Sequence, residues 1–78
     1  MTLNFWSMGY THKIKDNYNY KTRKHEVEIE GFGNFTYDSD IITLKAAIDL
    51  YIFERITEAI LAGENEYAND LKKYEIEG

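Results

Sequence analysis

The sequence predicts an α+β fold in which a three-stranded antiparallel β-meander precedes a long helix, packed on the apolar face of the meander, and a short C-terminal helix. Three observations support this. Apolar and polar residues alternate in the first half of the chain, apolar residues recur at helical spacing in the second half, and clusters of turn-forming residues separate the segments. The 78 residues make one small domain, residues 1–78.

The clearest strand contains Val27 and Ile29, which alternate with three glutamates and therefore predict one apolar and one acidic face. The segment 31–34, Gly-Phe-Gly-Asn, then favours a turn, because glycine tolerates positive φ. Phe35 and Tyr37 continue the alternation in a second strand. We therefore expect a hairpin in which Ile29 pairs with Phe35 and Val27 pairs with Tyr37.

An earlier turn is predicted at residues 16–19, Asp-Asn-Tyr-Asn, because these residues are typical of turns. A hairpin around it would make residues 22–30 the central strand. All apolar side chains would then share one face, and a slip of one residue would invert a strand. The expected pairs are Trp6 with Ile29, Met8 with Val27 and Tyr10 with His25.

A long helix is predicted after the strands. Ser39 or Asp40 is expected to cap its N-terminus and Gly63 to end it. The apolar residues at helical spacing predict a broad stripe that packs on the sheet. The stripe consists of Ile41, Leu44, Ile48, Ile52, Ile56 and Ala59.

A second, shorter helix is predicted over residues 65–75, and its apolar face consists of Tyr67, Leu71 and Tyr74. Leu50, Phe53 and Leu61 lie on another side of the long helix, which the sheet does not cover. The short helix offers few apolar side chains to cover them. The sequence therefore predicts that these three residues lie in a homodimer or partner interface.

The chemistry-bearing residues predict a chain that is not an enzyme and that holds no metal or cofactor. The chain has no cysteine, and the spacing of its two histidines, His12 and His25, matches no common metal signature. Neither of the two serines has the context of an activated nucleophile. The glutamates of the acidic strand form a flat row rather than facing one another across a cleft. Residues 31–33 lack the third glycine of a dinucleotide-binding loop.

Charge is distributed unevenly along the chain, which has a net charge of -5. Residues 1–25 contain five basic residues and one acid, a net charge of +4, whereas residues 26–78 contain four basic residues and thirteen acids, a net charge of −9. One explanation is neutralisation within the fold. The other is that the charged surfaces face partners.

The acidic half predicts a negative patch at one end of the sheet and a second one on the short helix. Carboxylates spaced on a rigid surface can imitate a nucleic-acid backbone and occupy a basic site on a partner. The alternative is a purely solubilising role. The first patch consists of Glu26, Glu28, Glu30, Asp38 and Asp40, and the second of Glu64, Glu66 and Asp70.

The first hairpin interleaves basic and aromatic residues near its predicted tip. Lysine and arginine can contact phosphate and tyrosine can stack on exposed bases, so nucleic-acid binding is one interpretation. A protein contact is the second, and a solvated hairpin whose lysines block strand addition is the third. The residues concerned are Lys13, Lys15, Tyr18, Tyr20, Lys21, Arg23 and Lys24.

In size and composition, the chain resembles the small, acidic, aromatic-rich proteins made by bacterial viruses. Many of those are stoichiometric inhibitors of host nucleic-acid enzymes, including anti-CRISPR proteins, and the resemblance carries no site residues. The leading expectation is a protein-binding module that docks on a basic surface of such an enzyme. A small nucleic-acid-binding protein and a structural homo-oligomer are the alternatives. Without a signal peptide or an uninterrupted apolar span, the chain is expected in the cytoplasm of a bacterial host cell, with no membrane partner.

Overall fold

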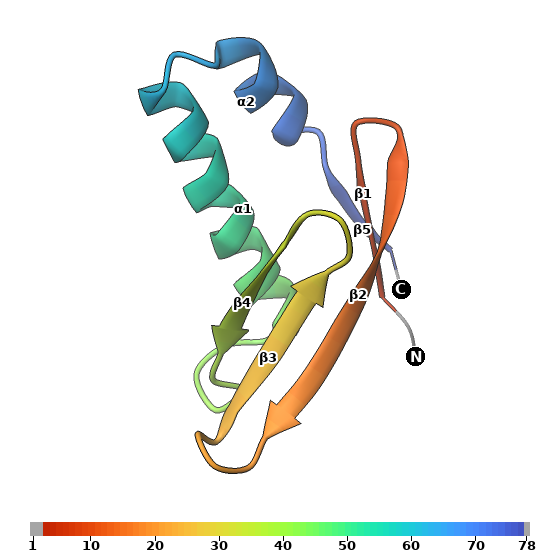
Figure 1. The fold of residues 1–78 in the computed structure, drawn as a ribbon, viewed down its shortest axis with the longest axis vertical. Coiled ribbons are helices and arrows are strands. Elements are labelled where there is room, and N and C mark those ends of the chain that lie inside the picture. The colour runs from red at the N-terminus through yellow and green to blue at the C-terminus, as the bar shows by residue number, and fades with distance from the viewer. Residues whose placement is uncertain (1–2, 78) are drawn as a thin grey trace.

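The computed structural model describes residues 3–77, which form a five-stranded antiparallel sheet and two helices (Figure 1). The α+β class predicted from the sequence is confirmed, but the sheet is larger than the predicted three strands. Its strand order is β4-β3-β2-β1-β5. The elements are β1 (Asn4–Ser7), β2 (Tyr10–Asn19), β3 (Lys24–Ile29), β4 (Gly33–Tyr37), α1 (Leu44–Leu61), α2 (Asn65–Leu71) and β5 (Glu75–Glu77).

A two-residue turn between β1 and β2 divides the segment that was expected to form a single strand. Met8 and Gly9 both have positive φ, 50° and 84°, which matches the right-handed twist of a tight hairpin. This turn places Phe5 and Ser7 on the inner face of the sheet, where both are buried. The prediction that Trp6 and Met8 face inward is therefore wrong, because the unforeseen turn changes which residues of β1 point to the core.

The turn between β2 and β3 lies at residues 20–23, four residues later than predicted. Asn19 stabilises it, because its side-chain oxygen accepts hydrogen bonds from the backbone N–H groups of Lys21 (2.9 Å) and Thr22 (3.3 Å). The backbone N–H of Arg23 donates to the carbonyl of Asn19 at 2.8 Å. The predicted pairs of this hairpin are consequently wrong. The observed pairs include Ile14 with Ile29, Asp16 with Val27 and Tyr18 with His25.

The hairpin of β3 and β4 is confirmed, but its register differs from the prediction by two residues. Val27 pairs with Phe35, and Ile29 pairs with Gly33. A shift by two residues leaves every side chain on its predicted face. Of the two glycines, only Gly31 has positive φ (76°). Gly33 instead allows a close approach of α1, because a Cβ there would overlap the hydroxyl of Tyr51.

Helix α1 begins at Leu44 and is capped by Thr43, not by Ser39 or Asp40 as predicted. The Oγ1 atom of Thr43 accepts a hydrogen bond from the backbone N–H of Ala46 at 3.2 Å. The side chain of Asp38 accepts a hydrogen bond from the backbone N–H of Asp40 at 2.9 Å. This bond belongs to a separate turn before the helix.

The C-terminus of α1 agrees with the prediction that Gly63 ends the helix. Gly63 has positive φ (79°), and its N–H donates to the carbonyl of Ile60 at 3.0 Å. The N–H of Glu64 donates to the carbonyl of Ala59 at 2.8 Å. This pair of bonds is the Schellman motif, in which a glycine at the end of a helix satisfies the last carbonyls.

Helix α1 covers one face of the sheet and buries a core against β1 to β4. Most of the predicted stripe is confirmed, although Ile41 lies before the helix and is exposed. Within residues 3–77, no helix combines the length and apolar character required to cross a membrane. The buried core consists of Phe5, Ile14, Val27, Ile29, Tyr37, Ala47, Ile48 and Ile52.

Helix α2 ends at Leu71, so the predicted helix over residues 65–75 is too long. Residues 75–77 alternate in polarity and pair with β1 as the short strand β5. Tyr74, between α2 and β5, stacks on Phe5 with a ring-centroid distance of 5.5 Å. Its hydroxyl donates a hydrogen bond to Asp49 of α1. Tyr74 therefore connects the C-terminal segment to the sheet through Phe5 and to α1 through Asp49.

The Tyr74 contact predicts a loss of stability at alkaline pH. Burial, followed by the hydrogen bond to Asp49 and its charge, raises the pKa of Tyr74 from 10.0 to about 12. The contribution of the phenol to the free energy of unfolding is therefore fully present below pH 10 and is lost as the pH rises towards 12. Tyr74→Phe should lower the free energy of unfolding by about 1–2 kcal/mol at neutral pH and make it fall less steeply at alkaline pH.

Urea unfolding between neutral and alkaline pH, followed by circular dichroism, tests this expectation. Tyr20→Phe is the matched control, because it removes the hydroxyl of an exposed tyrosine. Equal alkaline slopes in the parent and in Tyr74→Phe would contradict the assigned role of the Tyr74 hydroxyl.

Candidate functional site

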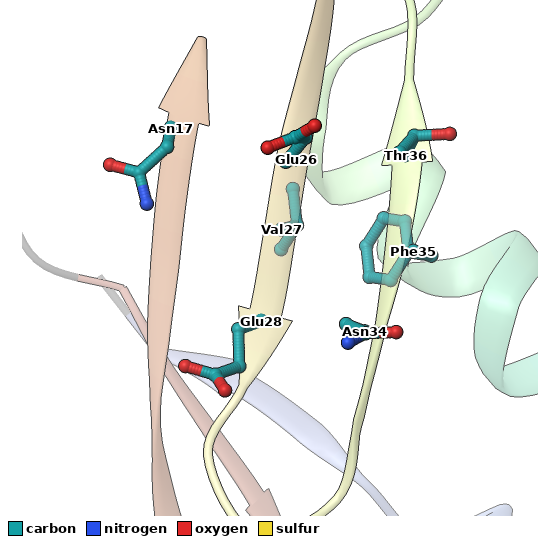
Figure 2. A pocket seen from close by; sticks show the side chains of 7 residues that line it. All are labelled: Asn17, Glu26, Val27, Glu28, Asn34, Phe35 and Thr36. Carbon is teal, nitrogen blue, oxygen red and sulfur yellow. The ribbon is translucent and has the colours of Figure 1, made fainter. Parts of the chain in front are cut away.

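The outer face of the sheet, opposite α1, is covered by neither of the two helices described and presents a row of glutamates. Val27 and Ile29 of β3 point into the core, so the alternating Glu26 and Glu28 point outward. Figure 2 shows these two carboxylates between Asn17 of β2 and the residues of β4. This placement agrees with the alternation that the sequence predicted for β3.

Cross-strand neighbours complete two rows on the outer face. Glu26 pairs with Asn17 and Thr36, while Glu28 pairs with Lys15 and Asn34. The Oε2 atom of Glu26 accepts a hydrogen bond from the Nδ2 atom of Asn19 at 3.0 Å. The Oε1 atom of Glu28 lies 3.9 Å from the Nζ atom of Lys15. An exposed ion pair of this length contributes little to stability, so Glu28 remains available to another cation.

A shallow hollow of about 340 Å³ lies between these rows (Figure 2). Its polar rim offers two carboxylates, two side-chain amides and one hydroxyl. These groups can accept several hydrogen bonds from a cationic group such as a guanidinium or an ammonium. The lining residues are Asn17, Glu26, Val27, Glu28, Asn34, Phe35 and Thr36.

The five acids predicted to form one patch are separated by the structure. Glu30 follows the end of β3, in the turn to β4. Because Tyr37 pairs with His25 near the start of β3, Asp38 and Asp40 lie beyond the opposite end of that strand. Only Glu26 and Glu28 of the five line the hollow. The acids at and within α2, namely Glu64, Glu66 and Asp70, form a separate group, because α2 lies away from β3 and β4 in the fold (Figure 1).

The tip of the β2–β3 hairpin gathers part of the predicted basic and aromatic set. Tyr20, Lys21 and Arg23 lie in the turn itself, and all three are exposed. Lys13 and Lys15 instead lie within β2, away from the tip, where they are exposed. The predicted set is therefore divided between the tip and the strand. Tyr18 and Lys24 complete the part at the tip.

Four aromatic rings extend from the tip towards the core. The ring centroids of Tyr20 and Tyr18 are 4.9 Å apart, those of Tyr18 and His25 are 5.0 Å apart, and those of His25 and Tyr37 are 4.8 Å apart. Tyr20 is 85% exposed and Tyr18 is 40% exposed. The outer two rings therefore present aromatic surface to solvent, while the inner two support them.

Asp16 holds the two inner rings of this row, His25 and Tyr37, in place. Its Oδ1 atom lies 2.8 Å from the Nδ1 atom of His25, and its Oδ2 atom accepts a hydrogen bond from the hydroxyl of Tyr37 at 3.3 Å. Burial, followed by the negative charge of Asp16 and this hydrogen bond, raises the pKa of Tyr37. Asp16 was predicted to lie in a turn, and this role does not follow from the sequence, because only the register of β2 against β3 brings Asp16 beside His25.

The other histidine has a structural role. The Nδ1 atom of His12 lies 2.9 Å from the carbonyl oxygen of Glu30, and its ring packs near Phe5 and Phe32. Within residues 3–77, no group of three or more His, Asp or Glu side chains is placed to hold a metal ion.

Comparisons with family models, curated proteins and solved structures found no match to this chain. Its function therefore has to be inferred from the geometry and chemistry of its own residues.

Proposed function

We propose that this chain is a non-catalytic protein-binding module whose outer sheet face docks on a basic surface of another protein. The observation that supports this most directly is the pair Glu26 and Glu28, which flank an open hollow lined by hydrogen-bonding groups. A lysine or arginine side chain of the partner would enter the hollow and displace the weak contact between Glu28 and Lys15.

The partner class we propose is a host nucleic-acid enzyme, which the chain would inhibit in the manner of small phage proteins, with a CRISPR effector as one example. The net charge of -5 and the carboxylates carried on a rigid strand suit a surface that normally binds phosphates. Binding of this kind should weaken as salt screens the charges.

The test is an affinity pull-down with the tagged chain from a bacterial lysate, at low and high salt and with and without nuclease. One stoichiometric host protein that survives nuclease and is lost at high salt would support the proposal. Recovery that is insensitive to salt, or that disappears after nuclease treatment, would contradict docking through the acidic face.

A second candidate function is the binding of single-stranded nucleic acid at the hairpin tip. It is favoured by the row of four aromatic rings that runs from Tyr20 to Tyr37. Tyr20 and Tyr18 offer exposed rings for base stacking, and Lys21, Arg23 and Lys24 offer positive charge for phosphates. The acidic outer face opposes this function, which is why it ranks second.

We expect Tyr18→Ala/Tyr20→Ala to weaken any such binding by at least about 30-fold, because each of the two stacked bases contributes about 1–3 kcal/mol. An electrophoretic shift assay at low salt with single-stranded oligonucleotides measures the effect. Tyr10→Ala is the matched control, because Tyr10 is exposed but lies outside the hairpin tip. No shift with the parent chain at micromolar concentration would count against this candidate.

A further inference from the structure

The side of α1 that faces away from the sheet carries a largely apolar seam with a regular spacing, in which the hydroxyl of the one threonine, Thr57, donates a hydrogen bond to the carbonyl of Phe53. We call the residues Ala46, Leu50, Phe53, Thr57 and Ile60 the α1 seam. Successive members are separated by four, three, four and three residues, which is the spacing of the core positions of a coiled coil. Leu61 lies beside the end of the seam. This spacing extends over almost all of the 18 residues of α1.

The seam is uncovered in the monomer, because α2 packs elsewhere on α1. The exposed fractions are 56% for Leu50, 66% for Phe53 and 47% for Ile60, and that of the neighbouring Leu61 is 82%. Together these side chains expose on the order of 500 Å² of apolar surface, which is near the upper end for the largest patch on a monomer. The residues predicted from the sequence to lie in an interface are thus solvent-exposed in the monomer.

We propose that a second copy of this chain covers the seam by packing its own α1 antiparallel to the first. A seam with coiled-coil spacing is complementary to another helix with the same spacing, and a second copy supplies one. Two such patches would bury about 1,000 Å² in total, which lies at the lower limit for specific interfaces. In the antiparallel arrangement, Leu50 of one copy packs against Ile60 of the other, and Phe53 packs against Thr57.

The flanking charges select the antiparallel orientation. Asp49 and Glu54 lie on opposite sides of the seam. A parallel pair of helices would place Glu54 of one copy beside Asp49 of the other, which is a like-charge contact. The antiparallel pair instead places Glu54 near Leu61, and Asp49 near Ile56. It therefore avoids the repulsion without requiring a new partner for Asp49, which already accepts the hydroxyl of Tyr74.

A dimer would also have a consequence for docking on a basic partner, and this consequence rests on the function proposed above. In each copy, α1 packs on the inner face of the sheet, so the outer face lies on the side away from α1. Pairing through α1 would therefore leave both outer faces uncovered, on opposite sides of the dimer. The two Glu26–Glu28 hollows would then be available to two basic partner surfaces at once. A bivalent binder gains avidity when both sites can engage together.

Sedimentation equilibrium of the untagged chain, from about 1 μM to about 1 mM, measures the assembly directly and does not depend on any partner. The mass should rise with concentration from 9.2 kDa to twice that value. Phe53→Glu should weaken dimerisation at least about 100-fold, because it would bury a charge in the apolar seam. Ile41→Glu is the matched control, because Ile41 is 77% exposed but lies outside the helix, and this variant should dimerise like the parent.

Cross-linking tests the orientation, since the native chain has no cysteine. Leu50→Cys/Ile60→Cys should cross-link the two copies through a short bis-maleimide, whereas Leu50→Cys alone should remain uncross-linked. Efficient cross-linking of the single variant would show a parallel pair and overturn the antiparallel arrangement. A parent that remains a monomer throughout, or a dimer that Phe53→Glu leaves intact, would overturn the interface itself and assign the seam to a different protein or to solvent.

Discussion

Reversing the two charges at the hollow, in Glu26→Lys/Glu28→Lys, is expected to weaken partner binding by at least about 100-fold. Loss of one member of a desolvated charge pair costs about 2–5 kcal/mol, and reversal adds repulsion from the basic surface of the partner. Both side chains are exposed, so the variant should fold normally. The measurement is recovery of the captured host protein in the pull-down, followed by a titration with the purified partner.

The matched control for this variant is Glu64→Lys/Glu66→Lys, which changes the net charge by the same amount at the start of α2. It should retain most of the binding if the position of the charge matters, and it should lose as much as the first variant if only the net charge matters. Glu26→Gln/Glu28→Gln, which keeps the shape of the hollow, should lie between the parent and the reversal. Equal binding by the parent and the reversal would contradict docking through the outer face.

The largest effect on stability is expected for Phe5→Ala. Phe5 is fully buried and contacts Phe32 and Tyr74, so its truncation removes packing among the sheet, the β3–β4 turn and the C-terminal segment. We expect a loss of about 4 kcal/mol in the free energy of unfolding. A domain of 78 residues has a total stability of only about 4–12 kcal/mol, so this variant should be largely unfolded at elevated temperature.

Trp6→Ala is the matched control for Phe5→Ala, because Trp6 is the next residue of β1 and points to the outer face. The loss in the free energy of unfolding should be about 1 kcal/mol, the average for single substitutions, because Trp6 is only half-buried. Urea unfolding should be followed by far-ultraviolet circular dichroism, since Trp6 is the sole tryptophan. If Trp6→Ala lowered the free energy of unfolding more than Phe5→Ala, the observed orientation of β1 would be contradicted and the orientation predicted from the sequence would be supported.

The candidate site could be predicted only as far as it depends on a single strand. Glu26 and Glu28 share a face because successive side chains of a strand alternate, whatever its register. The hollow also needs Asn17 and Thr36 on neighbouring strands, and those positions depend on two turns. Asp16 joins His25 and Tyr37 for the same reason. Asp38 and Asp40 were predicted to extend the acidic row, but β4 runs antiparallel to β3 and places them beyond the end of β3 that is opposite Glu30.

The sequence by itself determined the α+β class, the inner and outer faces of β3 and β4, and the end of α1 at Gly63. These features follow from local rules: the period of a strand, the period of a helix and the tolerance of glycine for positive φ. The tertiary structure decided the Met8–Gly9 turn, the register of β2 and the addition of β5 beside β1. Pairing between distant strands depends on which turns form and on which side chains then fill the core. The contacts that make one register more stable than another join residues that are far apart in the sequence, so local patterns do not reveal them.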